Sequence, residues 1–461
     1  MRIQLAVVSA AVVVACSAAT AFGSTPARGQ LALPGSVASR SAAAASYPDW
    51  PTYHDTSYRH GESTSMPTAS GTPRVVTKLA LDGAVYGSPI IIRGWTIVAT
   101  ENNTVYAFNA AYQLRWKTHL GTPSPASQRP CGDIPLLGIT GTPGYSSTTD
   151  FVYVAPEFSG SPPTHQLYGL YIGTGTVRLH RSLDLSGVDS AAMQERGALL
   201  VDGHRVFVPF GGLAGDCGQY KGRVVGYSER GTGNPISYTV PTAREGGIWT
   251  PPGPVGDYYG HIFVAVGNGA SGPGDPYDFS DSILNMSTSL KLTDSFSPST
   301  WAQDNQVDHD LGSQAPTIVG SWIFADGKSG TAYVLRRDDL GHIGGQVSSA
   351  TVCTSFGGTA VVGNVVYVPC SDGLRAVSIS STGRIQILWH ADSSITGSPV
   401  VGGGRVWSLD RSGVLYALNP ATGAVISQVT VGAVSRFATP AIWGPDLRIP
   451  TTAGVTIVRT S

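Results

Sequence analysis

Short apolar segments alternate with turn residues along most of the chain. One complete unit spans residues 395–431, where the apolar segments are separated by turns rich in Gly, Asp and Asn. Four short antiparallel strands joined by such turns are typical of one blade of a β-propeller. The strands predicted in this unit cover residues 400–401, 406–409, 414–418 and 425–431.

The opening of this unit recurs along the chain. Each opening is a small residue followed by Pro or, in two weaker copies, by Ala, just before an apolar strand. Recurrence at a spacing that fits four-stranded units indicates a repeat architecture with eight blades. The openings are marked by Pro89, Pro143, Ala198, Pro252, Pro316, Ala360, Pro399 and Pro440.

The last copy is too short to form a whole blade. Only 461 − 440 = 21 residues follow Pro440, which is enough for three short strands. A spare strand over residues 74–81 precedes the first opening, as residues 114–120 precede the second. An N-terminal strand that completes the C-terminal blade would close the ring and remove its open edges. The sequence therefore predicts an all-β fold, a single eight-bladed β-propeller of four-stranded antiparallel blades.

Composition supports this fold and limits the partners. Gly accounts for 58 of the 461 residues and has no three-residue period, so a collagen-like chain is excluded. Charged residues make up only 13% of the chain, and the net charge is −1. No basic stripe is present, so nucleic acid is not an expected partner. We expect a monomer.

The N-terminus reads as a targeting segment. Arg2 is followed by an apolar run, and residues 19–21 match a small-x-small cleavage site, so we expect a signal peptide over residues 1–21. The alternative is a lipobox-like segment ending at Cys16, which would give the protein a lipid anchor. Both alternatives export the protein to the cell envelope or exterior. Residues 22–46 read as a flexible Ala/Ser/Pro linker, residues 47–461 as the propeller, and no other stretch could span a membrane.

Cysteine usage agrees with export. Setting Cys16 aside leaves four cysteines, Cys131, Cys217, Cys353 and Cys370, an even number that suits two disulfides outside the cell. Four cysteines allow three connectivities. No CxxCH motif for covalent haem is present.

The blades resemble the pyrroloquinoline-quinone (PQQ) repeat family. The resemblance rests on tryptophan-containing blades with turns such as Thr422-Gly423, and it covers roughly residues 50–461. This family includes eight-bladed quinoprotein dehydrogenases and non-catalytic scaffolds such as outer-membrane assembly lipoproteins. The repeat implies the fold, but it serves both enzymes and scaffolds.

Four segments resemble the cofactor pocket of the dehydrogenases, in the family's order. The resemblance implies that Trp249 forms the floor beneath PQQ, that Asn268 ligates a Ca²⁺ or lanthanide ion, and that Lys328 touches the quinone oxygens. It also implies that Asp310 ligates the metal and acts as general base. Hard cations take oxygen ligands, and alcohol oxidation needs a base for the hydroxyl proton.

Two departures from the family pattern bear on the cofactor. Gly132 stands where the family has the second of two adjacent cysteines, so the disulfide ceiling is absent. The family's metal-binding Glu falls on Cys217, with Asp216 beside it as a substitute ligand. Since these two sites are adjacent in the family pocket, the resemblance implies a Cys131–Cys217 disulfide. Cys353 and Cys370 flank one blade segment and are expected to form a structural disulfide.

Three functions follow from this resemblance. We rank first a binding or scaffold protein that holds a protein or glycan ligand on a propeller face. The alternatives are a PQQ- and metal-dependent dehydrogenase for a small alcohol or sugar, and a hydrolase or lyase that reuses the pocket without quinone. A separate loop with Asp275, Asp278 and Asp281 could bind Ca²⁺, but its spacing is not that of an EF-hand and favours a solvated loop.

Overall fold

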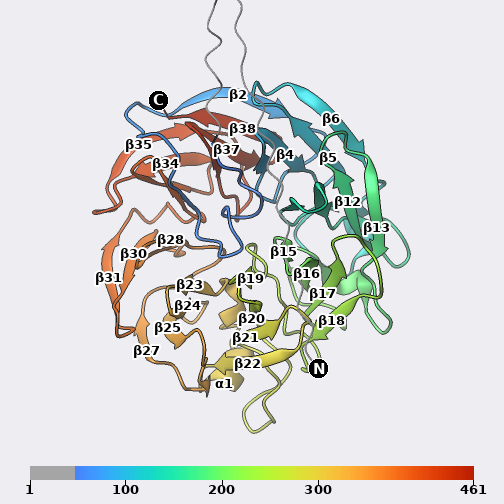
Figure 1. The fold of residues 1–461 in the computed structure, drawn as a ribbon. Coiled ribbons are helices and arrows are strands. Elements are labelled where there is room, and N and C mark those ends of the chain that lie inside the picture. The colour runs from blue at the N-terminus through green and yellow to red at the C-terminus, as the bar shows by residue number, and fades with distance from the viewer. Residues whose placement is uncertain (1–46, 461) are drawn as a thin grey trace, which may run out of the picture. The chain divides into compact units, whose positions relative to one another are not determined.

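Eight antiparallel sheets form a closed ring in the computed structural model, which describes residues 47–460 (Figure 1). The fold predicted from the sequence is confirmed. The signal peptide, the lipidation candidate Cys16 and the linker lie outside the described residues. Among residues 47–460, no helix is long and apolar enough to cross a lipid bilayer.

Each blade has four strands, ordered from the axis outward. The first four blades are β3 (Ile90–Ile92), β4 (Trp95–Ala99), β5 (Thr104–Phe108) and β6 (Leu114–His119); β9 (Gly144–Ser146), β10 (Phe151–Val154), β12 (Thr164–Tyr171) and β13 (Val177–Ser182); β15 (Leu200–Asp202), β16 (Arg205–Gly212), β17 (Arg223–Ser228) and β18 (Ile236–Thr239); β19 (Val255–Gly256), β20 (His261–Val266), β21 (Ser282–Ser287) and β22 (Leu292–Ser297).

The second half of the ring repeats this order. Blades five to eight are β23 (Thr317–Val319), β24 (Trp322–Ala325), β25 (Thr331–Arg336) and β27 (Ser348–Thr351); β28 (Ala360–Val362), β29 (Val365–Val368), β30 (Arg375–Ile379) and β31 (Ile385–His390); β32 (Val400–Gly402), β33 (Arg405–Leu409), β34 (Val414–Leu418) and β35 (Val425–Thr430); β36 (Ala441–Trp443), β37 (Asp446–Thr451), β38 (Gly454–Arg459) and β2 (Arg74–Ala80). Every predicted opening lies at the start of an innermost strand.

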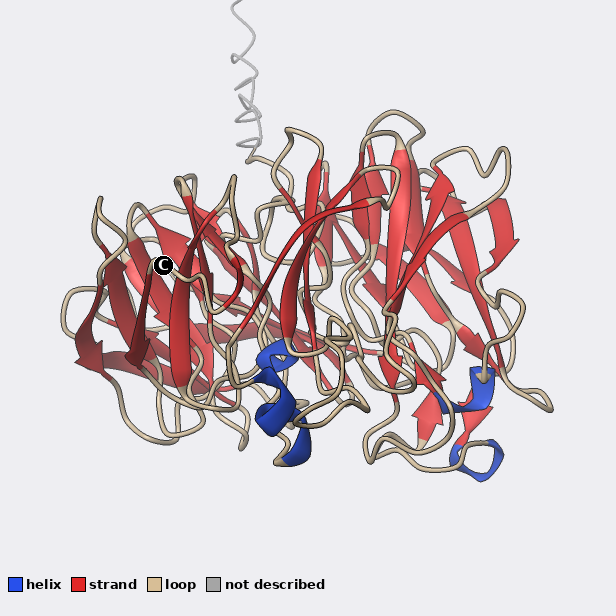
Figure 2. Ribbon diagram, turned by 90° about the horizontal axis from the view of Figure 1, so that it is seen from below, coloured by secondary structure: helices blue, strands red, loops and turns tan. Residues whose placement is uncertain are grey.

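The structure also contains several short helices and strands that the repeat pattern does not predict. Short helices lie toward one face of the ring, where the chain also forms long connections (Figure 2). These helices are α1 (Trp301–Gln306), η1 (Ala126–Gln128), η2 (Ser190–Ala192) and η3 (Leu311–Ser313), and the extra strands are β1 (Glu62–Ser63), β7 (Ser124–Pro125), β8 (Leu136–Leu137), β11 (Glu157–Phe158), β14 (Met193–Gln194) and β26 (His342–Ile343).

The ring closes where the sequence predicts. β2 runs antiparallel to β38, with Arg74 opposite Arg459 and Ala80 opposite Gly454. In Figure 1 the blue strand β2 accordingly lies beside the red strand β38. The outer strand of the eighth blade thus comes from the N-terminal side of the first blade, so the blade is complete only when both ends of the chain are in place.

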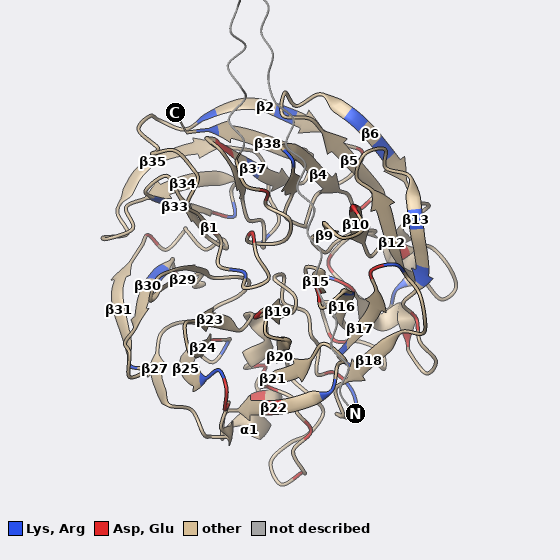
Figure 3. Cartoon of the chain, in the orientation of Figure 1, with Lys and Arg blue, Asp and Glu red and all other residues tan. Residues whose placement is uncertain are grey.

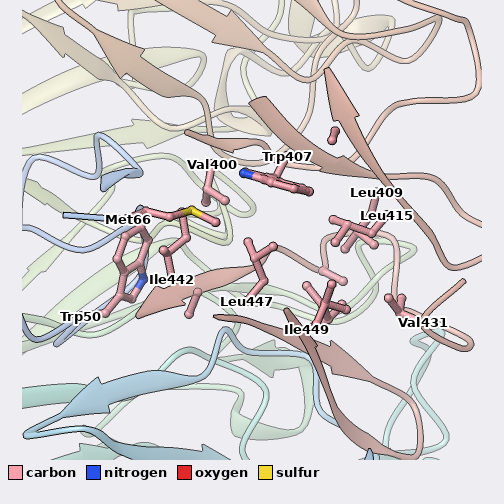
Figure 4. Packing of buried hydrophobic residues seen from close by; sticks show 14 of the residues in the cluster. Trp50, Met66, Val400, Trp407, Leu409, Leu415, Val431, Ile442, Leu447 and Ile449 are labelled. Atoms are coloured by element: carbon pink, nitrogen blue, oxygen red, sulfur yellow. The ribbon is translucent and has the colours of Figure 1, made fainter. Parts of the chain in front are cut away.

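The core lies between neighbouring blades. Between the seventh and eighth blades, Trp407 packs with Leu447, Ile449 and Met66, all of them buried (Figure 4). Gly402 approaches this cluster so closely that a Cβ atom there would lie 2.8 Å from the sulfur of Met66. Apolar residues on both faces of each blade explain why the strands read as continuous apolar runs. Lys, Arg, Asp and Glu accordingly colour only short stretches of the strands in Figure 3.

Residues 50–63 form an axial plug, which the sequence analysis identifies only as the start of the folded part. Trp50 exchanges two backbone hydrogen bonds with Ile91 in the first blade. The carbonyl oxygen of Ser57 accepts a hydrogen bond from the fourth blade, and that of Gly61 accepts one from Val401 in the seventh. The plug therefore joins blades far apart around the ring, and its chain enters the centre of the view in Figure 1.

Two buried side chains fasten the axial plug. His54 binds the carbonyl oxygen of Thr359 through Nδ1 at 2.9 Å and the hydroxyl of Thr439 through Nε2 at 2.8 Å. Burial lowers the pKa of His54 to about 3, so its ring is neutral at physiological pH. Arg59 donates hydrogen bonds to carbonyl oxygens of Leu199 and Pro254 at 3.1 and 3.2 Å.

Candidate axial ligand site

A cavity of about 580 Å³ lies on the propeller axis. Its wall is built from the connections of several blades, and it contains all five side chains that the sequence analysis assigns to the pocket. A single hollow with a few convergent polar groups is the usual form of a small-molecule site. The five predicted residues are Asp216, Trp249, Asn268, Asp310 and Lys328.

Trp249 reaches the cavity because glycines surround its indole. A Cβ atom on Gly211 would lie 2.7 Å from the Cβ of Trp249, and one on Gly267 would lie 3.2 Å from its Nε1. Side chains at these positions would displace the ring. Glycine at these positions thus leaves room for a broad aromatic surface, which suits stacking against a planar ligand.

Asp310 and Lys328 form the central ion pair of the cavity. Lys328 Nζ lies 2.6 Å from Asp310 Oδ2 and 2.5 Å from Asp308 Oδ1. Burial alone would lower the pKa of Lys328, but the two carboxylates outweigh this effect and raise the pKa above its usual value. Lys328 is therefore held as an ammonium, with little of its side chain exposed.

The other oxygen of Asp310 is fixed by the backbone. Asn268 N–H donates to Asp310 Oδ1 at 2.5 Å, and a Cβ atom on Gly267 would meet that same oxygen. Asp310 is only 6% exposed, and this burial raises its pKa despite the neighbouring ammonium. A buried carboxyl group with a raised pKa is suited to exchanging a proton with a ligand.

Asn268 offers one free acceptor. Its Nδ2 donates to Asp308 Oδ1 at 2.8 Å, whereas its buried Oδ1 has no hydrogen-bond partner in the described chain. A buried acceptor without a donor is costly, so a ligand donor or a cation at this atom would be favourable.

The loop that positions Asp310 depends on residues that the sequence analysis does not assign to the site. Leu311 N–H donates to Asp281 Oδ1 at 3.0 Å, and Gly269 N–H donates to Asn305 Oδ1 at 2.7 Å. The solvated loop expected around Asp275, Asp278 and Asp281 is confirmed only at the exposed Asp275 and is wrong for the other two, which are 7% and 0% exposed. The pKa of Asp281 is raised well above its usual value by burial and by Asp310.

Asp216 lines the cavity together with the carboxylates of Asp308 and Asp310. Its carboxylate accepts a hydrogen bond from the hydroxyl of Tyr220 at 2.5 Å. The pKa of Tyr220 is raised by burial and by the charge of Asp216, so the phenol remains a donor. Asp216 is thus present in the cavity but already engaged.

The donor set fits a planar organic molecule better than a divalent metal ion. Ca²⁺ takes six to eight oxygen ligands. Both oxygens of Asp310 are engaged with protein donors, and an ammonium already neutralises this carboxylate. Within residues 47–460, no three His, Cys, Asp or Glu side chains are grouped so that they could hold a metal ion. Asn268 Oδ1 has no hydrogen-bond partner within the described residues and lines the cavity, whereas the equally unpartnered Oδ2 atoms of Asp278 and Asp281 belong to residues that do not line it.

Both expected disulfides are formed. Cys131–Cys217 joins the connection before the second blade to a loop of the third, with 6.2 Å between the Cα atoms. These sulfurs pack with Ile134, Leu137 and Leu213 beside the cavity. Cys353–Cys370, with 5.7 Å between the Cα atoms, links the connection after the fifth blade to the sixth.

Two arginines and two phenylalanines of the cavity were missed by sequence reasoning. Arg196, Phe356, Arg436 and Phe437 line the same hollow as Asp310. They come from connections near the weak opening at Ala198, near Ala360 and before Pro440, where no motif marks them. The only available signal was their position just before a blade opening, which places a residue near the axis.

Comparisons with known proteins agree with the fold. A scan against models of protein families finds no match, and a search of curated proteins finds none. Among solved structures, the quinohemoprotein alcohol dehydrogenase ADHIIG from Pseudomonas putida HK5 is similar with a TM-score of 0.70 at 14% identity, over 89% of this chain and 79% of that one.

Two further solved structures are similar to the chain. A europium-containing methanol dehydrogenase gives a TM-score of 0.67 at 14% identity, over 88% of this chain and 90% of that one. BamB from Moraxella catarrhalis gives 0.56 at 16% identity, over 84% of this chain and 97% of that one. The chain therefore has the eight-bladed, PQQ-like propeller fold found in quinoprotein alcohol dehydrogenases and in BamB.

Proposed function

We propose that this chain is an exported binding protein whose axial cavity holds a small planar organic molecule. The observation that carries the proposal is the convergence of Trp249, Asn268, Asp310 and Lys328 on one cavity, although they come from different connections of the ring. The indole supplies a stacking surface, and the charged groups supply orientation. PQQ is the first ligand to test because the fold and these residues resemble the quinoproteins.

A second candidate is a PQQ-dependent dehydrogenase for an alcohol or sugar. It is favoured by the buried Asp310, whose raised pKa suits a general base. In that role the carboxylate would take the proton of a substrate hydroxyl, and Lys328 would hold the carboxylate in place at 2.6 Å. PQQ, when bound, would supply the two-electron acceptor.

Calorimetric titration of the purified protein with PQQ tests the binding function. We expect binding without added metal, weakened at least tenfold in Trp249→Leu, because the ring surface is lost. Trp95→Leu is the matched control, since Trp95 lies on β4 away from the cavity. Absence of PQQ binding to the wild type, with and without Ca²⁺ or La³⁺, would overturn the choice of PQQ as ligand.

A dye-reduction assay distinguishes the dehydrogenase function from the binding function. The protein loaded with PQQ is assayed with alcohols and sugars, alone and with Ca²⁺ or La³⁺. Activity that disappears in Asp310→Asn, while PQQ still binds, would support the dehydrogenase. Binding of PQQ without turnover of any substrate would leave the binding protein as the function.

Export is a further part of the proposal, supported by two disulfides among residues 47–460. The intact mass of the mature protein tests it. A start at residue 22 would indicate cleavage after the signal peptide, and a lipid-modified Cys16 would indicate an anchor. A cytosolic protein that retains Met1 would contradict both alternatives.

A further inference from the structure

We propose that Arg196 and Arg436 form a carboxylate-binding side of the axial cavity, and that the ligand is an aromatic carboxylate. This inference rests on the proposed binding function and names the chemical class of its ligand. The two arginines are not among the residues through which the sequence resembles the quinoproteins. They come from connections before the third and the eighth blade.

Aromatic rings hold both guanidinium groups in the cavity wall. Arg196 Cζ lies 4.3 Å from the ring centroid of Phe437, and Arg436 Cζ lies 5.4 Å from the same centroid. Arg436 Cζ also lies 3.9 Å from the ring centroid of Phe356. Contacts between a cation and an aromatic face position both charges around one ring.

Neither guanidinium makes a hydrogen bond or an ion pair with any residue of the described range 47–460. Arg196 is half-buried and Arg436 is exposed, and the fully buried arginines of the fold, Arg59 and Arg448, differ from both. Arg59 donates to backbone carbonyl oxygens, and Arg448 donates to the carbonyl oxygens of Trp443 and Asp446. Five N–H donors per guanidinium are therefore available at Arg196 and Arg436 for a group that enters the cavity.

The surrounding charges also favour an anion. Burial lowers the pKa of Arg196, and Arg436 lowers it further, while Asp133, Tyr86 and Glu101 act in the opposite direction. The pKa of Arg436 is likewise lowered by burial and then by Arg411, and Asp133 opposes this. Two cations in one wall repel each other, and Asp133 is too distant for an ion pair. An added oxyanion would relieve this repulsion.

The contact geometry favours a carboxylate over a spherical anion. A guanidinium whose face rests on an aromatic ring keeps its N–H edge free. Carboxylates match this edge with two parallel hydrogen bonds. Since the ring centroid of Phe437 lies 6.5 Å from that of Trp249, a molecule stacked on Trp249 would bring its substituents near the arginines.

The other charged side of the cavity faces a different part of the ligand. Asp308 and Asp310 share the ammonium of Lys328, and Asp216 adds a further carboxylate, so this side carries excess negative charge. A carboxylate would be repelled there and attracted by Arg196 and Arg436. The expected ligand therefore has its carboxylate at the arginines and a hydroxyl or amine donor toward Asp310.

Calorimetric titration with 2-naphthoate and 2-naphthamide tests this assignment. The two compounds share a ring system and differ in charge. We expect the wild type to bind naphthoate at least tenfold more tightly, and Arg196→Gln/Arg436→Gln to lose this preference while naphthamide binding stays within twofold. Arg115→Gln is the control, because Arg115 also lies over an indole, that of Trp95, but on an outer strand.

A salt titration of the wild type gives a second readout that needs no variant. Raising NaCl from about 50 mM to about 500 mM should weaken the binding of naphthoate at least threefold and leave the binding of naphthamide unchanged, because salt screens the arginine charges. Equal affinity for the two compounds at low salt would overturn the arginine assignment and leave the binding function intact. Failure of naphthoate, naphthamide and PQQ alike to bind would overturn both proposals.

Discussion

Lys328 Nζ lies 2.6 Å from Asp310 Oδ2, although the two residues are 328 − 310 = 18 positions apart in the sequence. Their backbones meet as well, since Lys328 N–H donates to the carbonyl oxygen of Asp310 at 2.9 Å. The pair is thus built by the hairpin of the fifth blade folding against the connection that precedes that blade. It gives the cavity a fixed charge arrangement before any ligand enters.

Removing Lys328 should destabilise the site. In Lys328→Met, the buried carboxylate of Asp310 loses its nearest counter-ion, so we expect a loss of about 2 kcal/mol in the free energy of unfolding, measured with urea. Adding Asp310→Asn should recover part of this loss, because no unpaired charge remains. Equal and additive losses in the double variant would contradict the coupling.

Closure of the ring should contribute to global stability. Leu79 of β2 is 9% exposed and packs with Val455 and Ile457 of β38. Leu79→Ala should lower the free energy of unfolding by about 2 to 3 kcal/mol, as for other buried leucines. The neighbouring Lys78 is exposed, so Lys78→Ala should change stability by less than about 0.5 kcal/mol. Similar effects of the two changes would show that β2 does not close the ring in solution.

His54 should make the protein sensitive to acid. Its pKa is about 3 in the fold against a usual value of 6.5, because burial disfavours the charged ring and the cation of Arg59 acts in the same direction, against the hydrogen bond to the Thr359 carbonyl. The stability that depends on neutral His54 is present above pH 6.5 and is lost as the pH falls toward 3.

The variant His54→Gln isolates this effect, since glutamine stays neutral. Between pH 6.5 and 3, the wild type should lose up to about 1.4 kcal/mol more per pH unit than the variant, as measured by urea unfolding. Parallel pH profiles of the two proteins would show that His54 is not buried as a neutral ring.

The Cys131–Cys217 disulfide should stabilise the fold by restricting the unfolded chain. It closes a loop between residues separated by 86 positions, for which chain entropy predicts about 4.6 kcal/mol. Cys131→Ser/Cys217→Ser should therefore unfold at lower urea concentration. Peptide mapping without reduction checks the pairing directly, and a free thiol at either position would contradict it.

Most of the fold can be predicted from the repeat in the sequence, because each blade has its own turns and apolar strands. The opening at Pro399, for example, precedes β32, and the predicted strand over residues 414–418 coincides with β34. Ring closure could be predicted because the last blade lacks a strand that residues 74–81 can supply. Local pattern and global topology agree at these positions.

The site was only partly predictable. Trp249, Asn268, Asp310 and Lys328 lie in segments that resemble a known pocket, and the structure brings them together. Arg196 and Arg436 could not be found this way, since no local pattern sets them apart from surface arginines. Asp281 was misjudged because Gly and Pro around it suggest a solvated loop, whereas the loop folds inward to hold Leu311 N–H.

The position of the axial plug has a consequence for the ligand site. Tyr53 of the plug is 1% exposed and shares a small gap with Arg196 and Phe437 of the cavity wall. Within residues 47–460, the plug therefore lies next to the cavity wall that carries Arg196 and Phe437. A substitution that shifts Tyr53 would be transmitted to that wall, so the N-terminal segment of the propeller and the occupant of the cavity are coupled through one packed layer of side chains.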